Sequence, residues 1–497
     1  MSIALPESAP RFLGVIATYF VFQVVLRLTL GDSLELDEAE QMILGQRLQA
    51  GYTGQPPLYT WLQIGFFAVF GHGVLALTLL KNLLLFLTFA GSFFAARQLG
   101  IRAALASASA LSLLLLTDIG WESQRDLTHS VLVTSMAALT LWLGCTMASG
   151  EVQLKHYALF GVLIGLGALS KPNYLFFLAA LVLSLYSLDR RLILRPAFLL
   201  SLLIATVLVS PYALWMSETT GVATSSMGKL DTTGPVSLEN LARNLAALGT
   251  AVLQFGVLFV VLFVATVRVW PRGWSPRDAA GKPAPVLLLL RLFWFSLAIL
   301  LAYLLITGAS TFKGRWLLPL LFYLPLLFFA LAPTDAFSER VVRRYAKVLL
   351  AAAILVSVGL FARVYVGPFF DKYTKPHFPA AELARVLDER IEGRWPIVAE
   401  NSLIAGNLKL HLPARFISFP PVDFPLPRRG DVLLVWDAGK DSEVPDKLVE
   451  YLESQSLNPV FAPQTPEILD VPLRQSKTRS FRLARRQVAL MPQGIAP

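Results

Sequence analysis

The chain has 497 residues and a formal net charge of +10, with 55% hydrophobic and only 15% charged residues. Soluble domains carry about 25% charged residues, so a water-soluble enzyme is excluded, and a chain this apolar would not stay disordered. Cys145 is the single cysteine, which excludes an intrachain disulfide framework. Residues 1–366 carry 26 Lys and Arg against 17 Asp and Glu, whereas residues 367–497 carry 17 against 16. The positive excess therefore lies in the apolar part, where it indicates membrane topology rather than nucleic-acid binding.

Apolar segments of the length that a bilayer requires follow one another up to residue 366, since a spanning helix needs about 20 apolar residues. In chain order they are Phe12–Leu30, Val74–Ala96, Ala103–Leu116, Leu127–Ala148, Tyr157–Leu169, Tyr174–Leu188, Pro196–Met216, Leu245–Val267, Val286–Thr307, Trp316–Leu331 and Val348–Val366. Pro57–Phe70 is apolar but short, and it predicts a half-buried or interfacial helix. We therefore predict a polytopic α-helical membrane protein with about eleven spans.

The charges of the connecting turns predict the orientation, because Lys and Arg collect on the cytoplasmic side. With the N-terminus inside, the inside turns hold most of the cations: Arg97, Arg102, Lys155, Arg190, Arg191, Arg195, and those of 268–291 and 340–347. The outer loops are then 31–73, 117–126, 217–244 and 308–315. The first apolar run lacks a cleavage site and stays as an anchor. Residues 1–366 are thus expected to form a transmembrane domain, and residues 367–497 to lie outside.

The tail has a different pattern, typical of a small α/β domain. Ala380–Glu392 and Pro445–Gln455 have a helical period, while Pro396–Glu400 and Asp431–Asp437 are short apolar runs bounded by turn residues, as buried strands are. Arg479–Arg485 alternates as a strand does, and Asp371–Pro379 is the expected linker. We predict one extracytoplasmic α/β domain over residues 367–497.

The first outer loop, Gly31–Glu40, contains five acidic residues directly after the first span. Ionisable residues near membrane depth are costly and are often functional. Leu34, Leu36 and Ala39 interleave the acids, which argues against a merely solvated loop. Asp37 is a suitable N-cap with Glu40 three residues later, so a capping box is the alternative structural explanation for Asp37.

Further polar residues fall at the outer ends of other spans. Arg125 and Asp126 precede the fourth span, with His129 just inside it, and an ordinary interfacial Arg–Asp pair is the alternative. Lys171, Lys313 and Arg315 are cations on the outer side, against the general trend, and they either extend to lipid head groups or bind an anionic ligand. Acids and cations on one face suit glycosyl transfer from a lipid phosphate, where a carboxylate takes the proton of the attacking hydroxyl and cations stabilise the departing phosphate.

Four segments together resemble the GT-C integral-membrane glycosyltransferases, in particular the bacterial branch similar to protein O-mannosyltransferases and the lipid A aminoarabinose transferase. They are Leu36–Ala39, Gln55–Tyr59, Gln124–Asp126 and Lys313–Pro319, and the resemblance extends over about residues 10–370. It implies a GT-C fold and an inverting transfer from a polyprenyl-phosphate sugar at the periplasmic face of the bacterial inner membrane. The acceptor is left open between lipid A, another lipid, a glycan and a protein.

The resemblance also implies roles for individual residues. Asp37 matches the catalytic acid of the first outer loop, Glu38 is its partner in the motif, and Asp126 matches the second acid. The Gln55–Tyr59 stretch matches a phosphate-binding loop, but Gln55 stands where the aminoarabinose enzyme has Lys. Phosphate contact is therefore expected from Lys171, Lys313 or Arg315, with Tyr59, Arg125 and His129 as further substrate-binding candidates. Asp37, Glu38 and Asp126 would be the oxygen ligands if the reaction used Mg²⁺ or Mn²⁺.

Two other functions stay open at this point. A transporter or flippase for a lipid-linked sugar would place ionisable groups near the midplane and show repeated halves, and the sequence has no visible duplication. A polymerase or ligase that joins whole glycans within the same superfamily would share every motif named above.

Overall fold

The computed structural model describes residues 5–52, 54–219, 238–274, 281–391, 393, 395–461, 463 and 465–492. The chain divides into two compact units. The first unit comprises Met1–Gln23, Gly54–Tyr59 and Lys81–Ser357, and the second comprises Val24–Thr53, Thr60–Leu80 and Val358–Pro497.

Apolar helices make up the membrane part of the chain, and within the described residues seven of them are long and apolar enough to cross a bilayer. They are α1 (Ala9–Thr29), α4 (Val74–Gln98), α7 (His129–Ser149), α11 (Ala197–Glu218), α13 (Leu238–Val267), α14 (Ala284–Thr307) and α17 (Glu339–Tyr365). Two bent pairs raise the number to nine if each is one span. The protein is thus a multi-pass membrane protein.

The bent pairs interrupt two of the predicted spans. In the first, α5 (Ala103–Leu111) and the 3-10 turn η1 (Ser112–Leu115) are followed at 76° by the π-helix η2 (Asp118–Glu122) and α6 (Ser123–Arg125). In the second, α15 (Gly314–Leu321) and α16 (Leu324–Leu331) meet at 44°. All eleven predicted segments are helical, but α8 (Leu154–Ala168) and α9 (Tyr174–Leu188) have only 15 residues each. Length and composition therefore support seven to nine spans among the described residues, and the predicted number of eleven is not established.

Short elements connect these helices. The expected interfacial helix is present as α3 (Leu58–Phe70). Between α9 and α11 lies α10 (Arg191–Leu194), and η4 (Thr334–Ala336) precedes α17. Of the predicted outer loop 217–244, residues 220–237 lie outside the described part of the chain.

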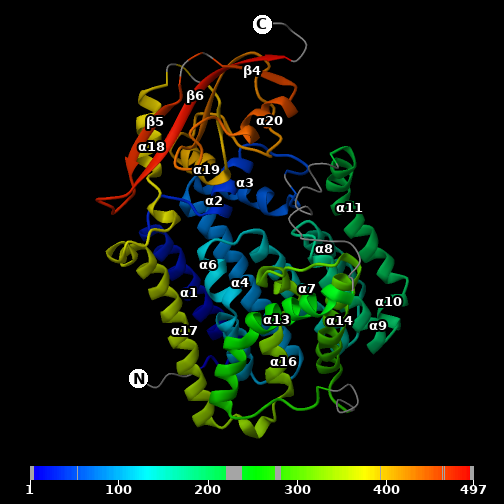
Figure 1. Ribbon diagram of the computed structural model, residues 1–497. Coiled ribbons are helices and arrows are strands. Elements are labelled where there is room, and N and C mark those ends of the chain that lie inside the picture. The colour runs from blue at the N-terminus through cyan, green and yellow to red at the C-terminus, as the bar shows by residue number, and fades with distance from the viewer. Residues whose placement is uncertain are drawn as a thin grey trace. The chain divides into compact units, whose positions relative to one another are not determined.

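The second unit contains a six-stranded mixed sheet in the order β2-β1-β3-β6-β4, with β5 also paired to β6. Figure 1 labels β4, β5 and β6 of this sheet. Its strands are β1 (Ile397–Ala399), β2 (Ile417–Ser418), β3 (Gly430–Asp437), β4 (Leu457–Phe461), β5 (Glu467–Pro472) and β6 (Ser480–Pro492). Strand β1 pairs in parallel with β2 and β3, with Val398 opposite Leu434, and β6 pairs antiparallel with β3, β4 and β5. The predicted small α/β fold is confirmed.

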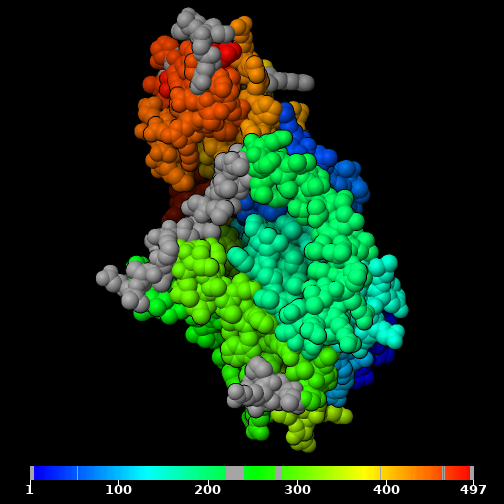
Figure 2. Space-filling model, turned by 90° about the vertical axis from the view of Figure 1, so that its right-hand side faces the viewer, coloured from blue at the N-terminus to red at the C-terminus, as the bar shows by residue number. Residues whose placement is uncertain are grey.

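Helices cover both faces of this sheet because alternate strand residues point to opposite sides. On one face, Ile397 and Leu433 pack with α18 (Ala380–Glu389) and α19 (Ser402–His411). On the other, Val398 and Trp436 pack with α20 (Asp446–Ser454). Residues from β3 to β6 give the orange to red surface in Figure 2. The short helices η5 (Gly367–Phe370) and η6 (Lys375–His377) lie in the expected linker.

Candidate active site

The helix α2 (Leu36–Leu44) carries Asp37, and its first turn differs from the prediction. Its N-cap is Glu35 and the capping-box partner is Glu38, whose Oε2 accepts the Glu35 backbone N–H at 3.2 Å. The predicted box of Asp37 with Glu40 was wrong, because the helix begins earlier than the sequence suggested. Asp37 therefore has no part in the capping box and lies, half-buried, in the first turn.

Glu38 forms a buried ion pair with Arg27 of α1, within the second unit. The Arg27 Nη2 atom lies 2.7 Å from Glu38 Oε2 and its Nε 3.3 Å from Oε1, with side-chain exposures of 8% and 2%. The remaining Arg27 donors reach the carbonyl oxygens of Gly31 at 3.0 Å and Ser33 at 2.9 Å. Because one guanidinium binds both the carboxylate and the preceding loop, it fixes that loop against the start of α2.

Glu35 is also neutralised by cations. Its carboxylate is 1% exposed and pairs with Arg363 of α17, and Lys375 Nζ lies 3.9 Å from its Oε2. Glu35 and Glu38 are therefore both buried and charge-paired, whereas Asp37 between them is only half-buried. Of these three acids, Asp37 is the one suited by exposure to meet a substrate.

A second set of contacts, from α19, holds the back of α2. The Leu34 backbone N–H donates to Asn407 Oδ1 at 2.8 Å. A Cβ on Gly406 would lie 2.5 Å from the carbonyl carbon of Ala39, so the two helices touch backbone to backbone. Close contact of this kind requires glycine and leaves α2 little room to shift. The loop and the helix that carry Asp37 are thus held rigidly by the second unit.

Asp32, at the start of the same loop, faces a basic patch of the second unit. Its carboxylate lies 3.5 Å from His411 Nε2 and 3.6 Å from Arg474 Nη1. Burial lowers the pKa of His411, an effect that Asp32 opposes. Burial likewise lowers the pKa of Lys409, whose Nζ donates to two carbonyl oxygens at 2.7 and 2.8 Å. His411 therefore favours its neutral form.

In the first unit, the predicted second acid lies in a buried polar segment between α6 and α7. Asp126 is 7% exposed and ends α6, and His129, which begins α7, is 6% exposed. The Tyr59 ring lies 5.4 Å from the His129 ring, and Lys171 Nζ donates to Ser130 Oγ at 2.7 Å. The start of α3 and the loop before α9 thus bring a phenol and an ammonium group to the imidazole at the start of α7.

The other predicted residues of the first unit make separate contacts. Asn173 donates to the Trp316 carbonyl at 2.9 Å, and Lys313 Nζ lies 6.0 Å from the centre of the Trp316 ring. Arg125 pairs with Glu122 at 2.6 Å, so this Arg is charge-compensated within its own turn. Gln55 is half-buried, and its Oε1 has no hydrogen-bond partner among the described residues.

The predicted residues are thus divided between the units: Asp37 and Glu38 belong to the second, and Gln55, Tyr59, Arg125, Asp126, His129, Lys171, Lys313 and Arg315 to the first. The sequence did not indicate Arg27, whose ion pair with Glu38 stabilises the helical turn that carries Asp37. The signal was available, because a lone Arg near the end of the first span requires a partner. Asp118, which lies against Gly314, was also missed. Among the described residues no group of three or more His, Cys, Asp or Glu could hold a metal ion.

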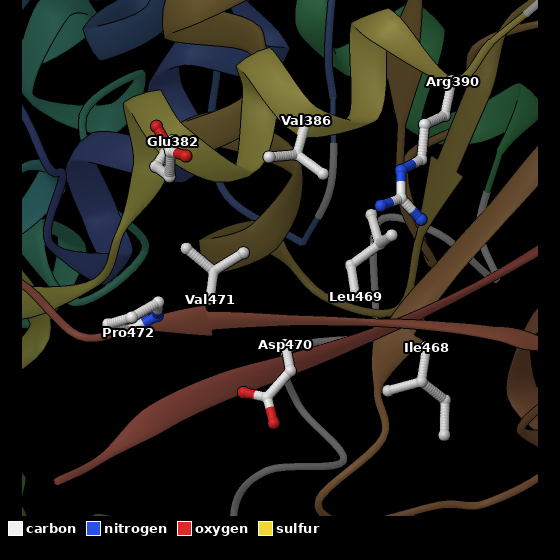
Figure 3. A pocket seen from close by; sticks show the side chains of 8 residues that line it. All are labelled: Glu382, Val386, Arg390, Ile468, Leu469, Asp470, Val471 and Pro472. Carbon is white, nitrogen blue, oxygen red and sulfur yellow. The ribbon is translucent and has the colours of Figure 1, made fainter.

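A shallow pocket of about 210 Å³ lies between α18 and β5 in the second unit (Figure 3). Val386, Leu469 and Val471 form its floor, and Glu382 and Arg390 lie at its edge. Both edge charges are exposed and paired, Glu382 with Arg385 and Arg390 with Glu467. This pocket has no buried acid that could act as a base, so we do not assign it to the reaction.

Sequence comparison identifies the family. The chain is 32% identical to the lipopolysaccharide core galacturonosyltransferase RgtB of Rhizobium johnstonii over 475 residues, which cover 92% of this chain and 93% of the relative. The chain belongs to the GT-C superfamily of membrane glycosyltransferases. Its identity to RgtA of the same organism, also a lipopolysaccharide core galacturonosyltransferase, is 32% over 457 residues, or 89% of this chain and 90% of that one.

Two further comparisons agree with a GT-C glycosyltransferase. Residues 54–215 match the family described as dolichyl-phosphate-mannose-protein mannosyltransferase. The crystal structure of ArnT from Cupriavidus metallidurans bound to undecaprenyl phosphate superimposes with a TM-score of 0.59 at 12% identity, over 96% of this chain and 97% of that one. At that identity the superposition shows the fold alone. The resemblance seen in the sequence motifs is confirmed, and the protein is a glycosyltransferase of the cell envelope with a GT-C fold.

Proposed function

We propose that this glycosyltransferase transfers galacturonic acid from a polyprenyl-phosphate donor to the lipopolysaccharide core. The observation that carries the proposal is the 32% identity to two lipopolysaccharide core galacturonosyltransferases over about nine-tenths of the chain. The similar region covers about nine-tenths of each chain, and substrate choice in membrane enzymes depends on the loops that such a region includes.

The proposed donor rests on the cations of the first unit. ArnT, which shares the fold, was crystallised with undecaprenyl phosphate. A galacturonate donor would carry a sugar carboxylate as well as the lipid phosphate, and so it needs more positive charge than a neutral sugar does. Lys171, Lys313 and Arg315 are the candidate cations, with Lys171 already oriented by its hydrogen bond to Ser130. Gln55, Tyr59 and His129 would contribute neutral contacts.

In the proposed reaction, Asp37 accepts the proton of the acceptor hydroxyl while the acceptor oxygen bonds to the anomeric carbon. The bond from that carbon to the phosphate oxygen breaks, and the lipid phosphate leaves with the electron pair, stabilised by the cations. A single displacement inverts the anomeric centre. Glu38 supports the start of α2 through its pair with Arg27, and we assign it a positioning role. Asp126 matches the second acid of the family's motif, and we propose it as the second catalytic carboxylate.

The orientation follows from the charges of the turns. Cations concentrate at 268–291 and 340–347, which we place in the cytoplasm. This puts the loop of Asp37 and residues 367–497 in the periplasm, with residues 1–366 as the catalytic domain in the inner membrane. A lipid-linked donor fits this side, since nucleotide sugars are not available there.

The Asp37→Asn variant tests the mechanism. Its transfer rate should fall about 10²- to 10⁴-fold, as is typical when a general base is removed, and its Tm should equal that of the wild type. Asp335→Asn is the control, because Asp335 is an exposed acid in η4 of the first unit. The assay is galacturonate transfer from undecaprenyl phosphate galacturonate to core oligosaccharide in liposomes. Near-normal turnover by the Asp37 variant would contradict the assignment of the base.

Two measurements test the function itself. Mass spectrometry of lipopolysaccharide with and without the gene should show core species lighter by one or more hexuronic acid residues in its absence. In the liposome assay, movement of the donor across the bilayer without sugar on a new acceptor would support a flippase instead. Addition of a preassembled glycan would identify a ligase.

A further inference from the structure

The broken span before α7 places an acidic residue against the start of α15. The chain turns by 76° between Ala103–Leu115 and Asp118–Arg125, and the π-helix η2 begins at Asp118. Gly120 permits this turn, because a Cβ there would lie 3.0 Å from the Leu114 carbonyl carbon and closer still to its oxygen. Single turns of π-helix inside helical segments occur frequently at functional sites.

The Asp118 carboxylate occupies the space that a side chain at position 314 would need. A Cβ on Gly314 would lie 3.1 Å from Asp118 Cγ and 3.2 Å from Oδ1, with Oδ2 nearer still. Gly314 is the first residue of α15, and its neighbours Lys313 and Arg315 are the two cations of that motif. A carboxylate at a helix start is favoured by the unpaired N–H groups and the dipole. Glycine at 314 is thus what allows the carboxylate to approach the helix.

Arg315 is the cation that this carboxylate acts on. Its guanidinium attracts Asp118, while Glu122 repels that carboxylate and is itself paired with Arg125. Arg315 is half-buried and makes no hydrogen bond or ion pair within 4 Å to any residue that the structure describes. A half-buried guanidinium with its donors unused is suited to an anion, whereas a direct pair with Asp118 would have consumed them.

We propose that Asp118 is a positioning residue that holds Arg315 and the start of α15 in place for the phosphate of the polyprenyl donor. Asp118 does not touch the donor. It fixes the direction of the guanidinium from the side, through its attraction and its contact with Gly314. This inference rests on the proposed function for the identity of the donor, and it adds a residue that none of the sequence motifs contained.

The test compares Asp118→Ala, Gly314→Ala and the double variant in the full-length protein in nanodiscs. The readouts are the Kd of undecaprenyl phosphate, and KM and kcat for the donor. If Asp118 positions Arg315, each single variant raises Kd and KM roughly ten-fold with kcat within about two-fold, because only donor binding is lost. The double variant should then match Asp118→Ala, since alanine at 314 has no carboxylate left to displace.

Gly249→Ala is the matched control, because a Cβ at that position in α13 meets no atom within 4 Å. It should leave Kd and KM unchanged. The inference would be overturned if Asp118→Ala bound undecaprenyl phosphate with the wild-type Kd. It would also be overturned if the increases in Kd of the two single variants added up in the double variant. A purely steric role would instead give a thermolabile Gly314→Ala that Asp118→Ala restores to wild-type Kd, and this result also refutes positioning.

The same measurements separate this inference from the proposed function. If the wild type transfers galacturonate and the variants bind undecaprenyl phosphate equally well, only the inference fails. If the wild type binds the lipid and the variants lose it while no galacturonate is transferred, only the proposed function fails. If the wild type does not bind undecaprenyl phosphate, both fail.

Discussion

Removal of the buried pair of Arg27 and Glu38 should have a large effect on stability, because both side chains are almost fully buried. Glu38→Gln keeps the shape of the side chain but removes its charge. The Arg27 guanidinium, 8% exposed, then keeps two carbonyl contacts and loses its charged partner. Removing one partner of a buried ion pair typically costs 3–5 kcal/mol, because the remaining charge is left uncompensated. We expect a loss of about 3 kcal/mol, at the lower end, since the carbonyl oxygens and Glu35 still offset part of the charge.

Thermal unfolding in nanodiscs measures this loss. For a unit of this size, 1 kcal/mol shifts Tm by roughly 2–4 °C, so Glu38→Gln should lower Tm by about 6–12 °C. The control is Glu382→Gln in α18, which breaks an exposed pair with Arg385 in the same unit and should leave Tm almost unchanged. Transfer should fall as well, because the loop before α2 loses its anchor.

A double variant distinguishes loss of the pair from general damage. Arg27→Met combined with Glu38→Leu removes both charges and retains apolar volume, and replacements of this kind are often neutral or stabilising. The double variant should therefore unfold at a higher temperature than Glu38→Gln. The reasoning is refuted if Glu38→Gln and Glu382→Gln have the same Tm, or if the double variant is less stable than the single one.

Two further predictions concern the second unit. Gly406→Ala should separate α19 from α2, because the added Cβ would press against the Ala39 backbone, and it should lower Tm by several degrees and the transfer rate at least ten-fold. Gly65→Ala is the control, since a Cβ at that position of α3 meets no atom within 4 Å, and it should change neither quantity. Equal Tm and equal transfer rates for the two variants would refute the contact. His411→Gln should reduce the loss of Tm between pH 7.5 and 5.5. Because burial lowers the pKa of His411, the unfolded chain binds its proton first, and stability falls as the pH drops through the usual His value near 6.5; an unchanged slope would contradict this.

The sequence predicted element types well and their interruptions poorly. Every long apolar run is helical, and the expected elements α18, β1, β3 and α20 of the tail are present. These helices and strands can be predicted because the spacing of apolar residues is a local property of the sequence. The bend between η1 and η2 depends instead on Gly120 packing against Leu114, a contact that no periodicity reports. Strand β2 was missed because its two residues are too short to show alternation.

The sequence predicts which residues belong to the candidate site, but not which residues form ion pairs with them. Motifs predict Asp37 and Asp126 as the acids of the site, and their catalytic roles stay predictions. The ion pairs that surround Asp37 come from residues far apart in the chain, since Arg363 lies more than 300 residues from Glu35. An unmatched charge in a span shows that a partner is needed, yet it does not say which acid provides it. The structure supplies that assignment for Arg27 and Glu38.

The geometry of one helical turn explains how adjacent acids acquire different roles. Successive residues of a helix are about 100° apart around the axis, so Glu35 and Glu38, three positions apart, lie on nearly the same side. That side meets Arg27 and Arg363, and both carboxylates are neutralised there. Asp37, one residue before Glu38, lies about 100° away around the axis and is half-buried rather than buried. The two buried pairs therefore hold the first turn of α2 and compensate the charges of Glu35 and Glu38. Without these pairs Glu35 and Glu38 would be two uncompensated buried carboxylates next to each other, and so the turn that carries Asp37 depends on Arg27 and Arg363 for its stability.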